Sequence, residues 1–342
     1  MEVDYKSVSE YGTTKSGDKI YACRLTNVGG AQMEVISYGA AVTSLKIAQS
    51  NGKLVDVVLG FDNIEAYEES FDLEAAPFFG AIVGRYAGRI KDGKFSLNGN
   101  NYELYQNNNG NSLHGGKMGF SRKSWTITNV NEDNNPSVTL TYRSPAGEEG
   151  YPGELTVSVK YTLTDKNEFM VEYSAQTSED TVLNLTHHSY FNVGGHDNTV
   201  EDLSLTLYCD KVLKFDSNVL PTGEILKVAD TDFDYTNTSR TCPTSIDNTF
   251  VTENRGLVAK LVSKSTNISL TVYTDQPGLH IYVGGNCFNK IKGKELVAYH
   301  PKSGICFETQ NFPDAPNQPS FPSSVLKKGD TYTQKTVYKF NS

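Results

Sequence analysis

The chain has 342 residues, a formal net charge of −9 and an aromatic-rich composition with 20 tyrosines, 16 phenylalanines and 29 glycines. This acidic balance argues against nucleic acid or an anionic membrane surface as a partner. Its five cysteines are scattered without a paired motif, no apolar run approaches the ~18 residues of a membrane-spanning helix, and the first residues lack a signal-peptide core, so we expect reduced thiols in a cytoplasmic protein.

Tight-turn signals occur early in the chain. Asn51-Gly52, Asp92-Gly93 and Asn98-Gly99 each join a residue that tolerates positive φ to a glycine, which is typical of β-hairpins. Between these turns, only the short stretch 64–70 predicts a helix. The early chain is therefore expected to consist mainly of strands joined by short turns.

The strand pattern continues to the C-terminus. Apolar and polar residues alternate in the segments 138–142, 155–163, 169–173 and 268–272. The second and third of these are separated by a short polar turn and predict a hairpin. Strands without intervening helices predict an all-β fold, a large antiparallel β-sandwich, which we expect to form one domain over residues 1–342.

Two candidate binding segments lie in the first half of the chain. In Gly84–Ile90, Arg85 and Arg89 alternate with other residue types, so one of the two arginines can project into a site. Its planar guanidinium would offer hydrogen-bond donors in a fixed geometry. His114 precedes two glycines, which would allow a ligand to approach the backbone closely. Each feature also has an ordinary explanation, as a solvated arginine or a histidine in a turn.

The segment 182–191 contains two adjacent histidines. If it is a strand, His187 shares one face with leucines, whereas His188 shares the other face with polar side chains. We therefore expect His188 to face a polar cavity and His187 to pack in the core. Neighbouring histidines on opposite faces cannot chelate one ion, so no zinc site is predicted.

The segment 304–319 is the strongest candidate for a catalytic element. It begins as a strand with Cys306 and Glu308 on one face, and after Thr309 its prolines end any ladder of hydrogen bonds. A carboxylate at the end of an apolar strand can have its pKa tuned and its rotamer held, although a solvated strand-end acid is the ordinary reading. Asp247 and Gln276 are two further polar residues near strand ends.

With these segments assembled, the chain resembles the aldose 1-epimerase (galactose mutarotase) family from end to end. Several separate motifs occur in the family's order. They are Val58–Phe61, Gly84-Arg85, Asn111–Gly116, Gly147–Gly153, Asn184–Thr186, His188–Phe191, Gln276–Gly278, Glu308–Gln310, Pro313–Ala315 and Asn317–Pro319. The resemblance implies the family's β-supersandwich fold and a sugar-binding cleft on it.

Carried over by position, the resemblance implies that Glu308 is the general base, His188 the general acid and His114 a second active-site histidine. The implied substrate-binding residues are Arg89, Asp247 and Gln276, with Tyr190 as a further residue lining the cleft. Two departures from the family's pattern stand out. Gly88 occupies the position before Arg89 where the family usually has asparagine, and His187 stands where asparagine is common.

The implied activity is interconversion of the α and β anomers of free aldohexoses, D-galactose and D-glucose, by acid–base opening and reclosure of the ring. This reaction is redox-neutral and needs neither metal nor cofactor, and we expect a monomer or homodimer. One alternative is a hexose 6-phosphate 1-epimerase, but Thr309, Gln310 and Asn311 beside Glu308 provide no basic cluster for a phosphate. A second alternative is a non-catalytic sugar-binding protein on the same fold.

Overall fold

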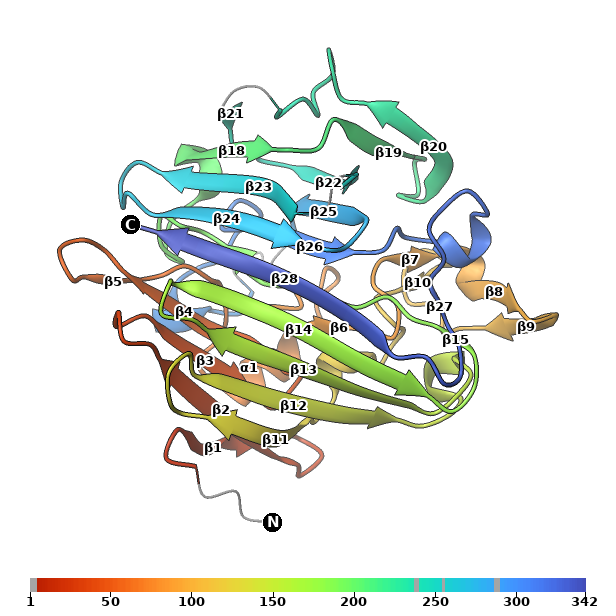
Figure 1. Ribbon diagram of the computed structural model, residues 1–342, viewed down its shortest axis with the longest axis horizontal. Coiled ribbons are helices and arrows are strands. Elements are labelled where there is room, and N and C mark those ends of the chain that lie inside the picture. The colour runs from red at the N-terminus through yellow and green to blue at the C-terminus, as the bar shows by residue number, and fades with distance from the viewer. Residues whose placement is uncertain (1–4, 237–239, 254–255, 286–289) are drawn as a thin grey trace.

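The computed structural model describes residues 5–236, 240–253, 256–285 and 290–342. Three larger sheets dominate it (Figure 1). The first is a meander whose strands lie in chain order: β1 (Val8–Thr13), β2 (Lys19–Thr26), β3 (Gln32–Ile36), β4 (Val42–Ala48) and β5 (Leu54–Asp56). The predicted all-β sandwich is thereby confirmed.

The second sheet has nine strands and faces the viewer in Figure 1. Its order is β11 (Thr126–Asn131), β12 (Ser137–Ser144), β13 (Leu155–Leu163), β14 (Glu168–Thr177), β28 (Tyr332–Asn341), β24 (Ser269–Thr274), β23 (Gly256–Ser263), β18 (Leu203–Leu207) and β21 (Arg240–Thr241). The predicted hairpin is confirmed, because β13 and β14 pair antiparallel in continuous register from Leu155↔Thr177 to Leu163↔Phe169.

The third sheet has six strands and lies behind the nine-stranded sheet in Figure 1. Its order is β17 (Tyr190–Phe191), β26 (Ile305–Gln310), β25 (Gly278–Val283), β22 (Ile246–Val251), β19 (Lys211–Phe215) and β20 (Pro221–Lys227). The remaining strands form two-stranded pairs: β6 (Ile82–Val83) with β16 (Thr186–His187), β7 (Arg89–Ile90) with β10 (Ser112–Leu113), β8 (Lys94–Leu97) with β9 (Asn100–Glu103), and β15 (Thr181–Val182) with β27 (Val325–Leu326).

The predicted helix is confirmed as α1 (Ile64–Ser70), which begins after Asn63, whose side chain accepts a hydrogen bond from the Ala66 amide. Short 3-10 turns occur at Lys91–Gly93, Phe120–Arg122, Glu148–Gly150, Val200–Asp202, Lys294–Leu296 and Ala315–Asn317. Among the described residues, none of the helices has the length and apolar character needed to cross a bilayer.

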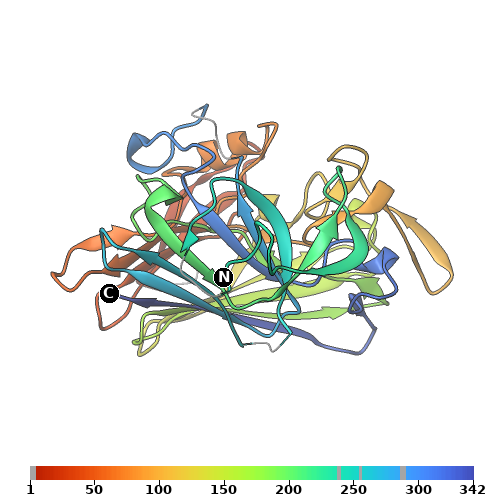
Figure 2. The same cartoon turned by 90° about the horizontal axis from the view of Figure 1, so that it is seen from above.

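The main core takes buried side chains from all three larger sheets, and the six-stranded and nine-stranded sheets form stacked layers in Figure 2. Phe191 of β17 packs against Tyr338 of β28 with ring centroids 4.8 Å apart, and the Tyr338 hydroxyl donates to the Phe307 carbonyl at 2.9 Å. Side chains alternate along a strand, so the burial of Phe307 in this core turns Glu308 to the opposite face. That face carries the candidate site.

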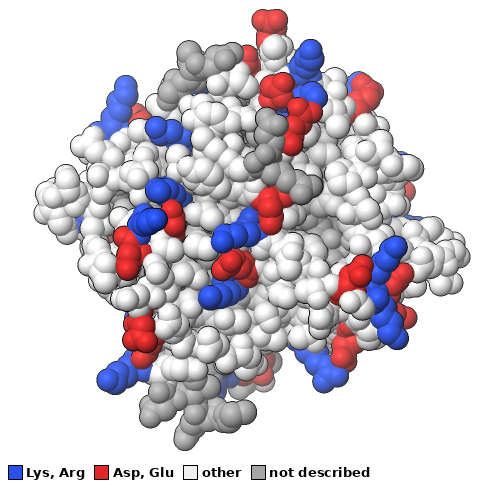
Figure 3. Space-filling model, in the orientation of Figure 1, with Lys and Arg blue, Asp and Glu red and all other residues white. Residues whose placement is uncertain are grey.

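The outer face of the nine-stranded sheet is polar and of mixed charge. Figure 3 shows lysines and arginines interspersed with acidic residues on it, with neither sign gathered into one patch. Ion pairs between neighbouring strands, such as Lys335 with Glu172 and Lys339 with Glu168, account for part of this pattern. The described residues on this face therefore form no basic stripe of the kind typical of nucleic-acid binding.

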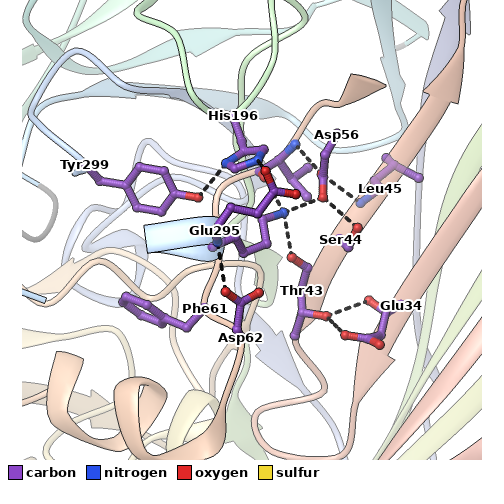
Figure 4. Close-up of polar contacts among 12 residues, drawn as sticks. Glu34, Thr43, Ser44, Leu45, Asp56, Phe61, Asp62, His196, Glu295 and Tyr299 are labelled. Carbon is purple, nitrogen blue, oxygen red and sulfur yellow. Dashed lines mark hydrogen bonds and ion pairs between the residues drawn. The ribbon is translucent and has the colours of Figure 1, made fainter. Parts of the chain in front are cut away.

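The segment that leads into β26 is fastened to the first sheet by a buried lysine. The Lys294 ammonium donates to the carbonyls of Thr43 and Val58 and to the Asp56 carboxylate at 2.7 Å, which uses all three of its donors. Figure 4 shows the surroundings of Asp56, whose other contacts include the Ser44 hydroxyl. The 3-10 turn Lys294–Leu296, which precedes β26 in the chain, is thus tied to the first sheet.

One sequence expectation needs correction. Residues 182–191 do not form one strand, because β15, β16 and β17 belong to three different sheets. Between these short strands, the amides of Asn184 and His188 bond to the carbonyls of Arg85 and Ala81. The segment passes from sheet to sheet, so its backbone partners change every few residues. The two histidines nevertheless point in opposite directions, as expected.

Candidate active site

A cavity of about 640 Å³ lies over the face of the six-stranded sheet that points away from the core. This volume falls within the ~300–1,000 Å³ usual for small-molecule sites. The sheet contributes Tyr190, Phe215, Asp247, His280, Tyr282, Glu308 and Gln310. Loops 71–78, 88–89 and 105–122, together with His188 and Pro313, supply the other lining residues.

Strand register brings the residues of the sheet together. Glu308 of β26 is the partner of His280 on β25, and Tyr282 on β25 is the partner of Asp247 on β22. On the other side of β26, Cys306 is the partner of Tyr190. Because side chains of directly paired residues share a face, these rows form the floor of the cavity.

Glu308 and His188 form the centre of the site. The His188 Nε2 lies 3.5 Å from Oε1 of Glu308, and the side chains are only 4% and 2% exposed. The other carboxylate oxygen, Oε2, is buried and accepts no hydrogen bond within the described part of the chain. A buried carboxylate oxygen without a donor is costly, so this atom is poised to receive a hydrogen bond from a ligand.

His114 stands beside this pair, with its ring centroid 5.4 Å from that of His188. Its Nδ1 accepts a hydrogen bond from the Gly88 amide at 3.3 Å. Burial, followed by the positive charges of His188 and Arg89, holds the pKa of His114 well below its usual value. The ring is therefore neutral near neutral pH and carries its proton on Nε2, which makes that nitrogen a donor.

The two glycines after His114 have a steric function. The φ angle of Gly115 is +85°, and a Cβ there would lie 1.9 Å from the carbonyl oxygen of Gly84. Only glycine fits this close approach of two backbone segments. The His-Gly-Gly motif therefore positions the histidine, rather than bringing a ligand to bare backbone as its sequence suggested.

Of the two arginines in the Gly84–Ile90 segment, only Arg89 lines the cavity. Its Nε donates to Oδ1 of Asn108 at 3.0 Å, which fixes the direction of the guanidinium. Arg85 is buried and bonds to Ser144 and to backbone carbonyls, so it stabilises the fold. Gly88 has a φ of +79°, and a Cβ there would lie 3.0 Å from Pro313, so a side chain would crowd this wall.

Asp247 lines the cavity as an ion pair with a histidine that the sequence analysis did not single out. The His280 Nε2 lies 3.1 Å from Oδ1 of Asp247, and Nδ1 of the ring lies 2.8 Å from the Thr249 hydroxyl. Burial opposes both charges. The hydrogen bond and charge of His280 nevertheless lower the pKa of Asp247, and Asp247 together with the charge of Glu308 raises the pKa of His280.

Gln276, the other expected sugar contact, does not line the cavity. It lies in the turn before β25, and its Nε2 donates to Asp275 at 2.8 Å. The alternation of Gly278–Val283 could have identified His280 instead, because it shares a face with Tyr282. His280 belongs to no recognisable motif, so only the alternation of side chains along its strand could have identified it.

The side-chain nitrogen and oxygen atoms of His114, His188 and Glu308 lie within 4.8 Å of one another, a spacing that would also suit a metal ion. A metal ligand must offer an unprotonated nitrogen. The free nitrogen of His114 is protonated, since its other nitrogen accepts the Gly88 amide. We therefore interpret the three groups as a set for transferring and donating protons.

The chain is similar to known proteins over most of its length. The family model described as aldose 1-epimerase matches residues 21–339. Galactose mutarotases of Bos taurus and Homo sapiens are 40% and 39% identical, each with 91% of both chains covered. An aldose epimerase homologue from C. elegans, a solved structure with 30% identity, superposes with a TM-score of 0.83 over 94% of this chain and 98% of its own. The galactose 1-epimerase of Lactobacillus acidophilus gives the same TM-score at 25% identity, with 98% of both chains covered.

Proposed function

The chain belongs to the aldose 1-epimerase family of enzymes that interconvert the anomers of aldoses, and we propose that it acts on free aldohexoses, D-galactose and D-glucose, in the cavity over the six-stranded sheet. One observation carries the assignment of the catalytic pair. Oε2 of Glu308 is buried and accepts no hydrogen bond from the described residues, and Oε1 of the same carboxylate is 3.5 Å from the His188 imidazole. The proposed base and acid are thus adjacent, and both side chains are almost fully buried.

The chemistry requires two proton transfers on atoms bonded to the same carbon. Glu308 takes the proton from the C1 hydroxyl while protonated His188 gives its Nε2 proton to the ring oxygen O5. The C1–O5 bond breaks, its electrons pass to O5, and a C1=O1 double bond forms. Rotation about C1–C2 presents the other carbonyl face, and reversal of both transfers closes the ring as the other anomer.

The short distance between the acid and the base suits this reaction. O1 and O5 are both bonded to C1, so the groups serving them must be close neighbours. A proton transfer by a positioned side chain contributes about 10²–10⁴-fold. Glu308 and His188 are each held by a strand or by a backbone bond, since His188 donates its amide to Ala81 and accepts the amide of Gly80 at its carbonyl. Neither group needs to be reoriented when the sugar binds.

His114 and Arg89 stabilise the oxygen atoms on which charge develops. His114 is neutral and presents Nε2–H, so it donates without competing for the transferred proton. Arg89 supplies a permanent positive charge whose direction Asn108 fixes. Donors fixed in advance at the site of charge development lower the barrier most effectively.

The His280–Asp247 pair serves the sugar's hydroxyl groups. Asp247 is held ionised by its partner and lines the cavity, so its free acceptor positions suit hydroxyl donors. Gln310 adds a buried Oε1 that accepts no hydrogen bond from the described residues. We assign Asp247, His280 and Gln310 to sugar binding, and Tyr190 to the wall against the sugar ring.

Polarimetry with freshly dissolved α-D-galactose tests the proposal. We expect the optical rotation to relax much faster with the protein than in buffer alone, and to reach the same final value. Relaxation at the buffer rate would refute the activity. A parallel run with glucose 6-phosphate tests the alternative, which requires that the phosphate ester react faster than glucose.

A further inference from the structure

A cysteine lies directly behind the proposed general acid. The Sγ atom of Cys306 is 3.6 Å from Nδ1 of His188, on the side of the ring opposite the nitrogen that faces Glu308. Cys306 is fully buried and precedes Glu308 by two positions on β26. Because side chains two residues apart share a face, one strand carries both the base and the group behind the acid.

We propose that Cys306 is a positioning residue, whose sulfur accepts the Nδ1–H of His188 and so holds the imidazole with Nε2 directed at Glu308 and the sugar's ring oxygen. This inference rests on the proposed function. It assigns the thiol a part in the reaction without contact to the substrate.

The bond can persist through the whole catalytic cycle. Protonated His188 carries hydrogen on both nitrogens and gives up the one on Nε2 to O5. The neutral ring that results keeps Nδ1–H, still directed at sulfur, and its bare Nε2 takes the proton back when the ring closes. The sulfur therefore serves the same hydrogen in both states, and no proton is gained or lost at Cys306.

A thiol suits this position better than a carboxylate. Sulfur is a weak acceptor, whereas a carboxylate would form a charge-assisted bond that stabilises the protonated imidazole. Burial, and then the charge of Glu308, raise the pKa of Cys306 well above its usual value, so the thiol stays neutral. The imidazole is thus oriented without an adjacent anion that would make its proton harder to release.

The thiol is itself held in place. Tyr190 is its register partner on β17 and hydrogen-bonds the cysteine side chain. The Tyr190 ring also lies 5.4 Å from the His188 ring. Cys306 is therefore fixed between a tyrosine and a histidine, whereas Cys209 and Cys242 are buried free thiols in the hydrophobic core.

The test compares Cys306→Ala, Cys306→Ser and the matched control Cys209→Ala. We expect Cys306→Ala to lower kcat for α-D-galactose about tenfold, as lost supporting partners commonly do, with KM changed by less than about twofold. Cys306→Ser restores an acceptor and should recover most of kcat. Cys209→Ala, also a buried thiol, should keep the wild-type kcat.

A second readout reports the proton directly. In nitrogen-15 NMR of histidine-labelled protein, we expect the neutral His188 ring to carry its proton on Nδ1, and Cys306→Ala to give a mixture of tautomers. A wild-type ring protonated only on Nε2 would overturn the proposal. So would a Cys306→Ala variant that folds and keeps full kcat. Wild-type protein that fails to accelerate mutarotation would instead refute the proposed function, whereas the tautomer measurement would still decide the hydrogen bond.

Discussion

His280 lies directly opposite Glu308 in the ladder between β25 and β26, and its Nε2 is 3.1 Å from Asp247. Against the effect of burial, the hydrogen bond to Asp247 and the charges of Glu308 and Asp247 raise the pKa of His280, which favours its protonated form on the floor of the cavity. This arrangement keeps the proposed base and the proposed sugar-binding acid from destabilising each other by like-charge repulsion. It also couples the charge of the site to the stability of the fold.

That coupling predicts a pH dependence. The pKa of His280 is raised in the folded protein, so the pair stabilises the fold fully below the ordinary histidine value of about 6.5 and loses this contribution as pH rises through the higher folded pKa. The pKa of Asp247 is lowered, so its part of the contribution is full above the ordinary aspartate value of about 3.9 and is lost as pH falls through the lower folded pKa. Urea unfolding of His280→Gln and wild type across pH should show the difference shrinking on the alkaline side. A constant difference would contradict the assignment.

Replacing the proposed base should separate chemistry from binding. Glu308→Gln keeps the shape but cannot accept the C1 hydroxyl proton, so we expect kcat to fall by about 10²–10⁴-fold, with a much smaller change in galactose affinity. Polarimetry gives kcat, and calorimetric titration with galactose gives the affinity. Glu172→Gln, on the outer face of the nine-stranded sheet, is the control. Near-normal turnover by Glu308→Gln would place the base elsewhere.

The close approach at Gly115 predicts a large steric effect. Gly115→Ala would force its Cβ to within 1.9 Å of a backbone oxygen and displace His114, so we expect loss of more than ~1 kcal/mol of stability and most of the activity. Gly99→Ala is the matched control, because Gly99 has a similar φ of +80° but nothing within 4 Å of the added Cβ. Thermal unfolding and polarimetry of the two variants check this. Equal losses of stability and activity in the two variants would show that the positive φ angle, and not the close approach to Gly84, causes the effect.

The buried Lys294–Asp56 pair predicts a non-additive stability effect. Burial opposes the ionisation of Asp56, but Lys294 holds its pKa below the usual value. Lys294→Met would leave the Asp56 carboxylate buried without its ion-pair partner and should lower the free energy of unfolding by about 3–5 kcal/mol. Adding Asp56→Asn removes that charge and should recover part of the loss. Chemical denaturation of both single variants and the double variant measures this, and strict additivity would argue against the pair.

Much of the site could be predicted from the sequence, because two of its signals are local. Alternation along β26 placed Glu308 on the face opposite Phe307, and the adjacent histidines were correctly separated into a core residue and a cavity residue. The His114 and Arg89 segments were also found, and the structure brings both residues to the cavity. These inferences needed only the period of a strand and a few motifs.

Other features depended on which strands become neighbours. His280 lies near both Glu308 and Asp247 because β25 is placed between β26 and β22, and this strand order cannot be read from the sequence. For the same reason, the sequence did not predict that residues 182–191 pass through three sheets. It also did not predict that Gln276 lies in a turn outside the cavity.

By itself, the sequence determined that the chain is built of strands, which face of each is apolar and which family it resembles, because side-chain alternation and motif spacing are properties of consecutive residues. Only the tertiary structure decided that Glu308 meets His188, that His280 pairs with Asp247 and that a thiol lies behind the His188 ring. These contacts join residues far apart along the chain, and the order and register of the paired strands bring them together.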